Sequence, residues 1–301
     1  MHKPIHTLSV SKPVCVWTAQ ALLGEGTLWS VNKQQLYWVD ILGHALHAYE
    51  PVQHQKTIWQ LSQEITAVAE CSHTDQLLVT LKHAFAYFDL TTQALTVLHQ
   101  PENEIATNRF NDGKCDVHGK FWAGTMDAQG LQPTGHFYRF HANGSCTHVP
   151  CGFQVTNGPA FTPDGQSMYL NDTVGGRVLR CQLNRQGDVV GTPENWLRFD
   201  TSDGFPDGMA VDKDGRVWIA HWGGGCVTCH DPHTTHELAR ITLPCSQVTN
   251  CCFGGAQLQT LFITTASVGL SPSQIQEQPL AGAVFSVETT CQGLPSPLFT
   301  P

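Results

Sequence analysis

A pattern that recurs about every 45 residues constrains the fold of this chain more than any other feature of its sequence. Six times, a segment with a polar residue, often followed by glycine, precedes a short run rich in β-branched or aromatic residues, as in residues 36–40 and 217–220. Such runs favour strands. Spacings of 41, 45, 46, 50 and 43 residues separate the six anchors, which are Glu25, Thr66, Asn111, Asn157, Asp207 and Asn250. A period of about 40–50 residues with several short strands is typical of β-propeller blades, so six anchors predict six blades.

The whole chain is therefore expected to form one all-β domain over residues 1–301. We expect a six-bladed β-propeller with four-stranded antiparallel blades around a central channel. Asp164-Gly165 and Asp214-Gly215 precede expected strands, and glycine supplies the positive φ that a tight hairpin turn requires. No Pro-, Gly- or Ser-rich linker divides the sequence. In such rings the N-terminal strand commonly completes the last blade, so residues 14–19 and 282–287 are the predicted closure.

Composition and charge exclude several classes of function. The chain has a net charge of −9, and it lacks the Lys/Arg cluster that binding to phosphate backbones requires. Its apolar runs fall short of the roughly 20 residues of a membrane span, and residues 1–12 lack the apolar core of a signal peptide. We therefore expect a cytoplasmic protein, a monomer or dimer, with no nucleic-acid or membrane partner. The 12 cysteines are expected to be reduced.

Four of the six anchors have side chains that suit a hard cation. In a propeller the inner strands begin near one end of the channel, so Glu25, Asn111, Asn157 and Asp207 are expected to converge on the axis. Two carboxylates and two amide oxygens suit Ca²⁺, Mn²⁺ or Mg²⁺, and also accept Zn²⁺ or Fe²⁺. Alternatively, Asn-Gly and Asp-Gly are ordinary turn dipeptides. Their recurrence at the blade spacing, before strands, favours a cation site and leaves both interpretations open.

Seven blocks in a fixed order resemble the senescence marker protein/regucalcin/gluconolactonase family, over about residues 22–287. The most specific of them is the Arg-Phe-Asn-Asp-Gly-Lys block. The seven blocks are Leu23-Gly24-Glu25-Gly26, Trp38-Val39-Asp40-Ile41, Arg109-Phe110-Asn111-Asp112-Gly113-Lys114, Ala123-Gly124-Thr125-Met126, Asn157-Gly158, Pro206-Asp207-Gly208-Met209 and Cys251-Cys252-Phe253-Gly254-Gly255.

The resemblance implies one divalent cation, Ca²⁺, Zn²⁺, Mn²⁺ or Fe²⁺, at the centre of a six-bladed propeller. It implies Glu25, Asn157 and Asp207 as the protein ligands, with waters completing the coordination. It also implies that Arg109 and Asn111 contact the hydroxyls and the carbonyl of a small-molecule sugar lactone.

The chain departs from the family pattern at one substrate contact. The animal members place a glutamate a few residues after the Gly-Thr-Met block, where this chain reads Asp-Ala-Gln. Gln129 or Asp127 is expected to take over that contact, with an altered substrate preference. His221, in a His-Trp-Gly-Gly segment similar to one in bacterial members, is expected to line the channel and face the substrate. Asp172 is expected either to orient Asn157 or to accept hydrogen bonds from backbone donors.

These residues suit metal-dependent hydrolysis of a sugar lactone to the aldonic acid. A divalent cation polarises a carbonyl and lowers the pKa of bound water. Asp207 is the candidate general base and later proton donor to the ring oxygen, and Arg109 supplies donors for the substrate or the oxyanion. The sequence has no Gly-x-Ser-x-Gly elbow, which argues against a serine hydrolase. Two alternatives stay open: a non-catalytic calcium-binding propeller, and a propeller esterase or phosphotriesterase.

Overall fold

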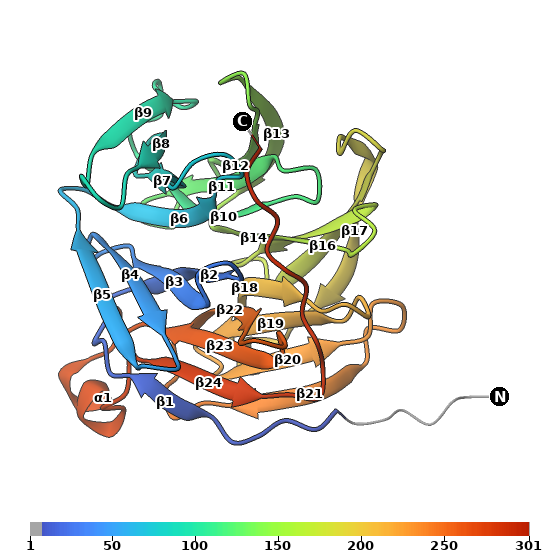
Figure 1. The fold of residues 1–301 in the computed structure, drawn as a ribbon. Coiled ribbons are helices and arrows are strands. Elements are labelled where there is room, and N and C mark those ends of the chain that lie inside the picture. Colours follow the sequence, from blue (N-terminus) through green and yellow to red (C-terminus); the bar gives the residue numbers. More distant parts are fainter. Residues whose placement is uncertain (1–7, 301) are drawn as a thin grey trace.

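Six four-stranded antiparallel sheets form a closed ring around a central channel (Figure 1). The structure, a computed structural model, describes residues 8–300. Within each of the first five sheets the strands follow the chain from the channel outward. The predicted six-bladed β-propeller with four-stranded blades is confirmed.

The first three blades use residues 24–153. Blade 1 contains β2 (Gly24–Ser30), β3 (Gln35–Asp40), β4 (Ala45–Glu50) and β5 (Gln55–Gln60). Blade 2 contains β6 (Ile65–Glu70), β7 (Leu77–Leu81), β8 (Phe85–Phe88) and β9 (Leu95–His99). Blade 3 contains β10 (Asn108–Cys115), β11 (Phe121–Asp127), β12 (Gly135–Phe140) and β13 (Cys146–Phe153).

The remaining blades use residues 156–288 and one strand from near the N-terminus. Blade 4 contains β14 (Thr156–Phe161), β15 (Ser167–Asp172), β16 (Arg177–Leu183) and β17 (Val189–Arg198). Blade 5 contains β18 (Phe205–Val211), β19 (Val217–Trp222), β20 (Cys226–His230) and β21 (Glu237–Thr242). Blade 6 contains β22 (Val248–Gly254), β23 (Thr260–Thr265), β24 (Val284–Glu288) and, outermost, β1 (Val14–Trp17).

The ring closes where β1 pairs with β24. The pairing is antiparallel, with Val14 opposite Ser286 and Cys15 opposite Phe285. This confirms the predicted closure by residues 14–19 and 282–287. Segments from the two ends of the chain thereby share one sheet.

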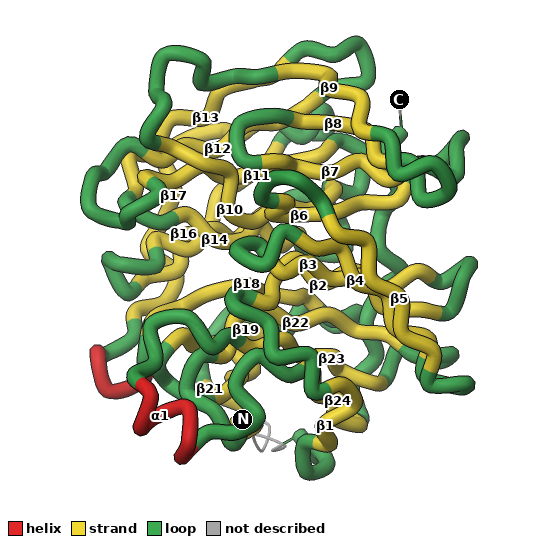
Figure 2. Tube along the Cα trace, turned by 90° about the vertical axis from the view of Figure 1, so that its left-hand side faces the viewer, coloured by secondary structure: helices red, strands yellow, loops and turns green. Residues whose placement is uncertain are grey.

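Within residues 8–300, two short helices lie in loops. The helix η1 (Thr201–Asp203) precedes β18, and α1 (Pro272–Glu277) lies between β23 and β24, beginning with a capping box at Ser271. Figure 2 shows α1 in red at the edge of the ring. In the part of the chain that the structure describes, no helix has the length and apolar character to span a membrane.

Apolar clusters between neighbouring blades hold the ring together. Trp29 of blade 1 stacks on Phe262 of blade 6, with ring centroids 5.4 Å apart. Phe85 of blade 2 packs edge-on against Phe110 of blade 3 at 4.7 Å. Burial of apolar surface between sheets is the main favourable contribution to such a fold. The blades are therefore rigid supports for whatever their inner strands carry.

The two ends of the channel differ. We call the end at which the inner strands begin the mouth, and the opposite end the floor. Residues 289–300, which we call the strap, cross the floor after β24, as the dark red segment in Figure 1 shows. Gly293 forms a β-bridge with Asp212 of blade 5, and Phe299 forms one with Cys71 of blade 2. The strap therefore spans the ring from one side to the other.

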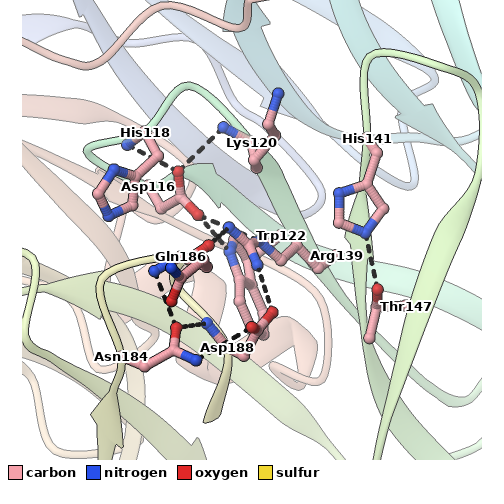
Figure 3. A network of polar contacts seen from close by, with 10 residues as sticks. All are labelled: Asp116, His118, Lys120, Trp122, Arg139, His141, Thr147, Asn184, Gln186 and Asp188. Carbon is pink, nitrogen blue, oxygen red and sulfur yellow. Dashed lines mark hydrogen bonds and ion pairs between the residues drawn. The ribbon is translucent and has the colours of Figure 1, made fainter.

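A charged network joins blades 3 and 4 at the floor (Figure 3). Arg139 lies with Nη1 3.0 Å from an oxygen of Asp188 and Nε 3.4 Å from one of Asp116. Trp122 Nε1 donates a hydrogen bond of 2.9 Å to Asp116. Because Arg139 and Asp116 are both buried, each charge depends on the other, and removing one would destabilise the floor.

Candidate active site

Each inner strand carries a β-bulge near its start, at the level of the anchor residues. The register shifts fall at Glu25/Leu28, Ile65/Ala67, Phe110/Gly113, Asn157/Ala160, Pro206/Met209 and Val248/Asn250. A bulge breaks the alternation of side chains and re-aims one of them. Gly26 and Gly158 lie in two of these bulges with φ of 58° and 86°, a conformation that favours glycine. The glycines after the anchors therefore serve bulges at the channel, and not hairpin turns.

Three buried carboxylates interact near the channel axis: Glu25, Asp112 and Asp207. Burial, and then repulsion by Asp112, raises the pKa of Glu25 to about 8. Burial, and then repulsion by Glu25 and Asp112, raises the pKa of Asp207 as well. Asp207 Oδ1 has no hydrogen-bond partner among the described residues. Such a group of carboxylates favours a bound positive charge.

The amide of Asn157 is held in one orientation by contacts on both sides. Its Oδ1 accepts a hydrogen bond of 3.0 Å from Asn111 Nδ2. Its Nδ2 donates to Thr173 Oγ1 at 2.9 Å, and that hydroxyl donates to the carbonyl oxygen of Pro206 at 2.8 Å. An amide oxygen has two lone pairs, so Asn157 Oδ1 keeps one for a further partner.

Arg109 begins the same chain of hydrogen bonds. Its Nη1 donates to Asn111 Oδ1 and to the carbonyl oxygen of Phe110, both at 2.8 Å. Burial lowers the pKa of Arg109, and the charges of Glu64, Glu25 and Asp207 oppose that shift. A guanidinium has five N–H donors, and these two contacts use Nη1 alone. Arg109 is therefore a buried positive charge beside the carboxylates, and its Nη2 and Nε groups are not used by these two contacts.

The oxygen atoms of this site fit a divalent cation. Glu25 and Asp207 supply carboxylates, and Asn157 supplies a fixed amide oxygen. Within residues 8–300, no group of three or more His, Cys, Asp or Glu side chains has the arrangement of a metal site. A ligand set of two carboxylates and one amide needs water to complete its coordination, which Ca²⁺ and similar hard cations accept.

The model of the SMP-30/gluconolactonase/LRE-like region matches residues 23–267. The chain belongs to this family. YvrE of Bacillus subtilis (strain 168) is 37% identical over 91% of this chain and 94% of its own length. L-arabinolactonase of Azospirillum brasilense is 34% identical over 92% of both chains. The matched region includes all six anchors and every blade strand except β1 and β24.

A solved structure shows the same fold. Regucalcin from Agrobacterium tumefaciens, described as a calcium-binding protein, has a TM-score of 0.91 to this chain at 28% identity. The match covers 96% of this chain and 97% of the other. The family resemblance predicted from the sequence blocks is confirmed by these comparisons.

Of the two residues expected to replace the family's substrate-contacting glutamate, Asp127 is engaged elsewhere and Gln129 is exposed. Asp127 Oδ2 accepts hydrogen bonds from the backbone N–H groups of Leu131 and Gln132, so it holds the loop after β11 in place. Gln129 lies exposed in that loop. Because Asp127 is opposite Asn108, the first residue of β10, this loop is at the mouth. Gln129 stays a prediction, at a position that suits it.

Two other predicted residues lie away from the carboxylates. His221 is fully buried in β19, where Nε2 contacts Thr228 Oγ1 at 2.7 Å and the ring packs against Phe199. The structure therefore places it between blades 4 and 5 and does not bring it to the axis. Asp172 accepts hydrogen bonds from the backbone of Gly175 and from Arg177. Asp172 does not orient Asn157, because Asn157 Nδ2 donates its hydrogen bond to Thr173. Of the two roles expected for Asp172, the structure shows the acceptance of a backbone hydrogen bond.

Sequence reasoning missed two charged residues of this region. Asp112 accepts hydrogen bonds from the backbone of Gly113 and Gly158, although its neighbour Asn111 is the anchor of the repeat. Glu64, just before β6, has a buried oxygen that lacks a partner among the described residues, and it lies near Arg109. The Asn-Asp-Gly-Lys block could have pointed to Asp112, but no sequence signal marks Glu64.

Proposed function

We propose that this protein is a sugar lactonase that hydrolyses an aldonolactone to the aldonic acid and depends on one divalent cation. The observation that carries the proposal is the pair of buried, mutually repelling carboxylates of Glu25 and Asp207, beside the fixed amide oxygen of Asn157. These three residues would hold the cation. The L-arabinolactonase relative supports a lactone as the substrate.

Asp207 is the proposed general base. A divalent cation, when bound, keeps nearby carboxylates ionised, polarises an ester carbonyl and lowers the pKa of water. Asp207 Oδ1, which lacks a partner among the described residues, accepts a proton from the attacking water. The water oxygen then bonds to the lactone carbonyl carbon. The bond from that carbon to the ring oxygen breaks, and Asp207 returns the proton to the ring oxygen.

Arg109 and Asn111 orient the lactone in this proposal. The unused N–H groups of Arg109 donate to substrate oxygens and to the negative charge that develops on the carbonyl oxygen. Asn111 fixes the guanidinium through its Oδ1 and fixes Asn157 through its Nδ2. The same amide thereby couples substrate orientation to ligand geometry.

The proposed cation is Ca²⁺, Zn²⁺, Mn²⁺ or Fe²⁺, and ligands that are all oxygen favour the harder members of this set. The similarity to a calcium-binding regucalcin supports a second candidate function, cation binding without turnover. Arg109 favours the enzyme, because a buried positive charge beside the ligands weakens cation binding, whereas its unused N–H groups suit a substrate.

Acid release from a panel of aldonolactones tests the proposal. The protein is stripped with a chelator and supplied in turn with Ca²⁺, Mn²⁺, Zn²⁺ or Fe²⁺. We expect turnover well above spontaneous hydrolysis with at least one pair of lactone and cation, and its loss on chelation. Tight cation binding without turnover of any lactone would support the second candidate instead.

A further inference from the structure

Asn250, the anchor of blade 6, is bound to the Glu25 carboxylate from across the ring closure. Its side chain is 1% exposed, on the inner strand β22. Its Nδ2 donates a hydrogen bond of 3.0 Å to Glu25 Oε2, and its Oδ1 accepts one of 2.7 Å from Thr27 Oγ1. Both partners lie on β2 of blade 1. One amide therefore spans two residues of the neighbouring blade.

The two contacts define which way the amide points. With the proposed cation bound, the Glu25 carboxylate is ionised and only accepts hydrogen bonds, so the atom facing it must be the amide nitrogen. The amide oxygen then needs a donor, and the Thr27 hydroxyl supplies it. The reversed amide would set Asn250 Oδ1 against the Glu25 carboxylate, with two acceptors in contact. Thr27 therefore stabilises the orientation that Glu25 requires.

Close packing restricts Asn250 further. Gly208, the residue after Asp207, lies so near that a Cβ atom there would overlap the amide of Asn250. The absence of a side chain at position 208 lets β18 approach β22 at the level of the carboxylates. Asn250 is thereby confined between the strand that carries Asp207 and the strand that carries Glu25.

Both donors to the Glu25 side chain go to the same oxygen. Gly26 N–H donates to Oε2 at 3.2 Å, and Asn250 Nδ2 donates to that atom as well. Oε1 is left for another partner. A glutamate has more rotatable bonds than an aspartate or asparagine, so its carboxylate needs more contacts to be held in one place.

We propose that Asn250 is a positioning residue, which occupies Oε2 of Glu25 so that Oε1 alone is presented to the cation, with Thr27 setting the orientation of its amide. This inference rests on the proposed function, in which Glu25 is a ligand. Groups that orient a metal ligand typically change metal affinity or activity by about 10–100-fold when they are removed. The same range is expected here.

Binding of Mn²⁺ to the stripped full-length protein tests the proposal independently of turnover. We expect Asn250→Ala to weaken Mn²⁺ binding by about 10–100-fold and to lower kcat/KM on the hydrolysed lactone in parallel. Asn143→Ala, in an exposed turn remote from the inner strands, is the matched control and should leave both unchanged. An Mn²⁺ affinity of Asn250→Ala within twofold of the wild type would overturn the proposal.

Thr27 separates the hydrogen bond from packing, and it also serves if Asn250→Ala does not fold. Thr27→Val keeps the shape and removes the hydroxyl, so it should weaken Mn²⁺ binding several-fold. Thr27→Ser keeps the hydroxyl and should bind Mn²⁺ within twofold of the wild type. Equal losses in the two variants would show that packing, and not the amide orientation, matters.

The wild type separates failure of this inference from failure of the proposed function. If it binds Mn²⁺ but hydrolyses no lactone, the lactonase proposal fails, while the ratio of variant to wild-type affinity still decides the role of Asn250. If the wild type binds no divalent cation, both proposals fail.

Discussion

At the mouth of the channel the inner strands carry bulges and buried carboxylates, whereas toward the floor the same six strands line a cavity of about 380 Å³ with mainly apolar residues. That cavity is bounded by the strap, through Leu294 to Pro297. Polar side chains at the floor, such as Asp116 and Asp212, are saturated by their own turns and by tryptophan N–H groups. At the mouth, Asp207 Oδ1 has no partner among the described residues.

The contrast shows how one set of strands separates chemistry from stability. Repelling buried carboxylates destabilise a fold unless something binds them, so the mouth retains groups that a purely structural end would have lost. The floor holds the ring with aromatic packing, ion pairs and β-bridges. Substitutions at the mouth should therefore change activity and cation binding, and substitutions at the floor should change stability.

The largest expected effect is that of Asp207→Ala at the mouth. We expect kcat/KM to fall by at least about 10³-fold, which corresponds to about 4 kcal/mol, because the general base and one ligand are lost. The Tm of the cation-free protein should stay equal or rise, since a repelled carboxylate is removed. Asp188→Ala, which removes an exposed carboxylate at the floor, is the control and should keep full turnover. Turnover of Asp207→Ala within tenfold of the wild type would contradict the mechanism.

At the floor, Phe299→Ala should be almost as costly, but to stability. Phe299 is fully buried in the strap and stacks on Phe140 with centroids 5.8 Å apart. Its truncation should lower the free energy of unfolding by about 3–5 kcal/mol, with kcat and KM retained. Leu294→Ala, on the same strap but 39% exposed, should cost under about 1 kcal/mol. Urea unfolding of the wild type, Phe299→Ala and Leu294→Ala measures these free energies. A fall in kcat for Phe299→Ala would show that the floor and the mouth of the channel are coupled.

Arg109→Ala should separate substrate handling from cation binding within the mouth. We expect about a 10–100-fold loss of kcat/KM, through both KM and kcat, because donors to the substrate and to its developing charge disappear and Asn111 Oδ1 loses its own donor. Affinity for the cation should stay equal or increase, since a positive charge is removed. Steady-state kinetics and cation titration measure the two effects. A variant that loses the cation instead would assign Arg109 to the ligand geometry.

A change of pH in the absence of a cation should affect stability alone. An unfolded glutamate titrates near 4.5, whereas burial and Asp112 raise the pKa of folded Glu25 to about 8. Between these values the folded state holds a proton that the unfolded state releases, so stability falls as the pH rises from about 4.5 to 8. We expect the Tm in chelator to drop across this window by about 3 °C or more relative to Glu25→Gln. The Tm of the wild type should therefore fall further below that of Glu25→Gln as the pH rises. A gap between the two Tm values that narrows with rising pH would refute the raised pKa of Glu25.

The sequence was sufficient to predict the number of blades and the closure of the ring. Strand patterns and turn dipeptides are local, so the repeat anchored at Glu25, Asn111, Asn157 and Asp207 was enough to predict six blades. The topology then brings the inner-strand anchors to one axis without further information. The pairing of β1 with β24 also followed, because a closed ring leaves no other partner for these edges.

The sequence could not show which side chains the bulges turn toward the axis. Asp112 follows its anchor directly and would point away in a regular strand, but the register shift between Phe110 and Gly113 alters that alternation. His221 in blade 5 packs against Phe199, which follows the outer strand of the neighbouring blade 4. Contacts of this kind arise from tertiary packing and leave no periodic signal.

The closure of the ring also determines when the last blade can form during synthesis of the chain. Val14 in β1 pairs with Ser286 in β24, so β1 leaves the ribosome long before the strand with which it pairs. At a synthesis rate of about 5–20 residues per second, that interval lasts roughly 14–54 s. During it, an edge that ends in Trp17 is without its partner. The sixth blade is therefore completed only after the inner strands of all six blades have been synthesised.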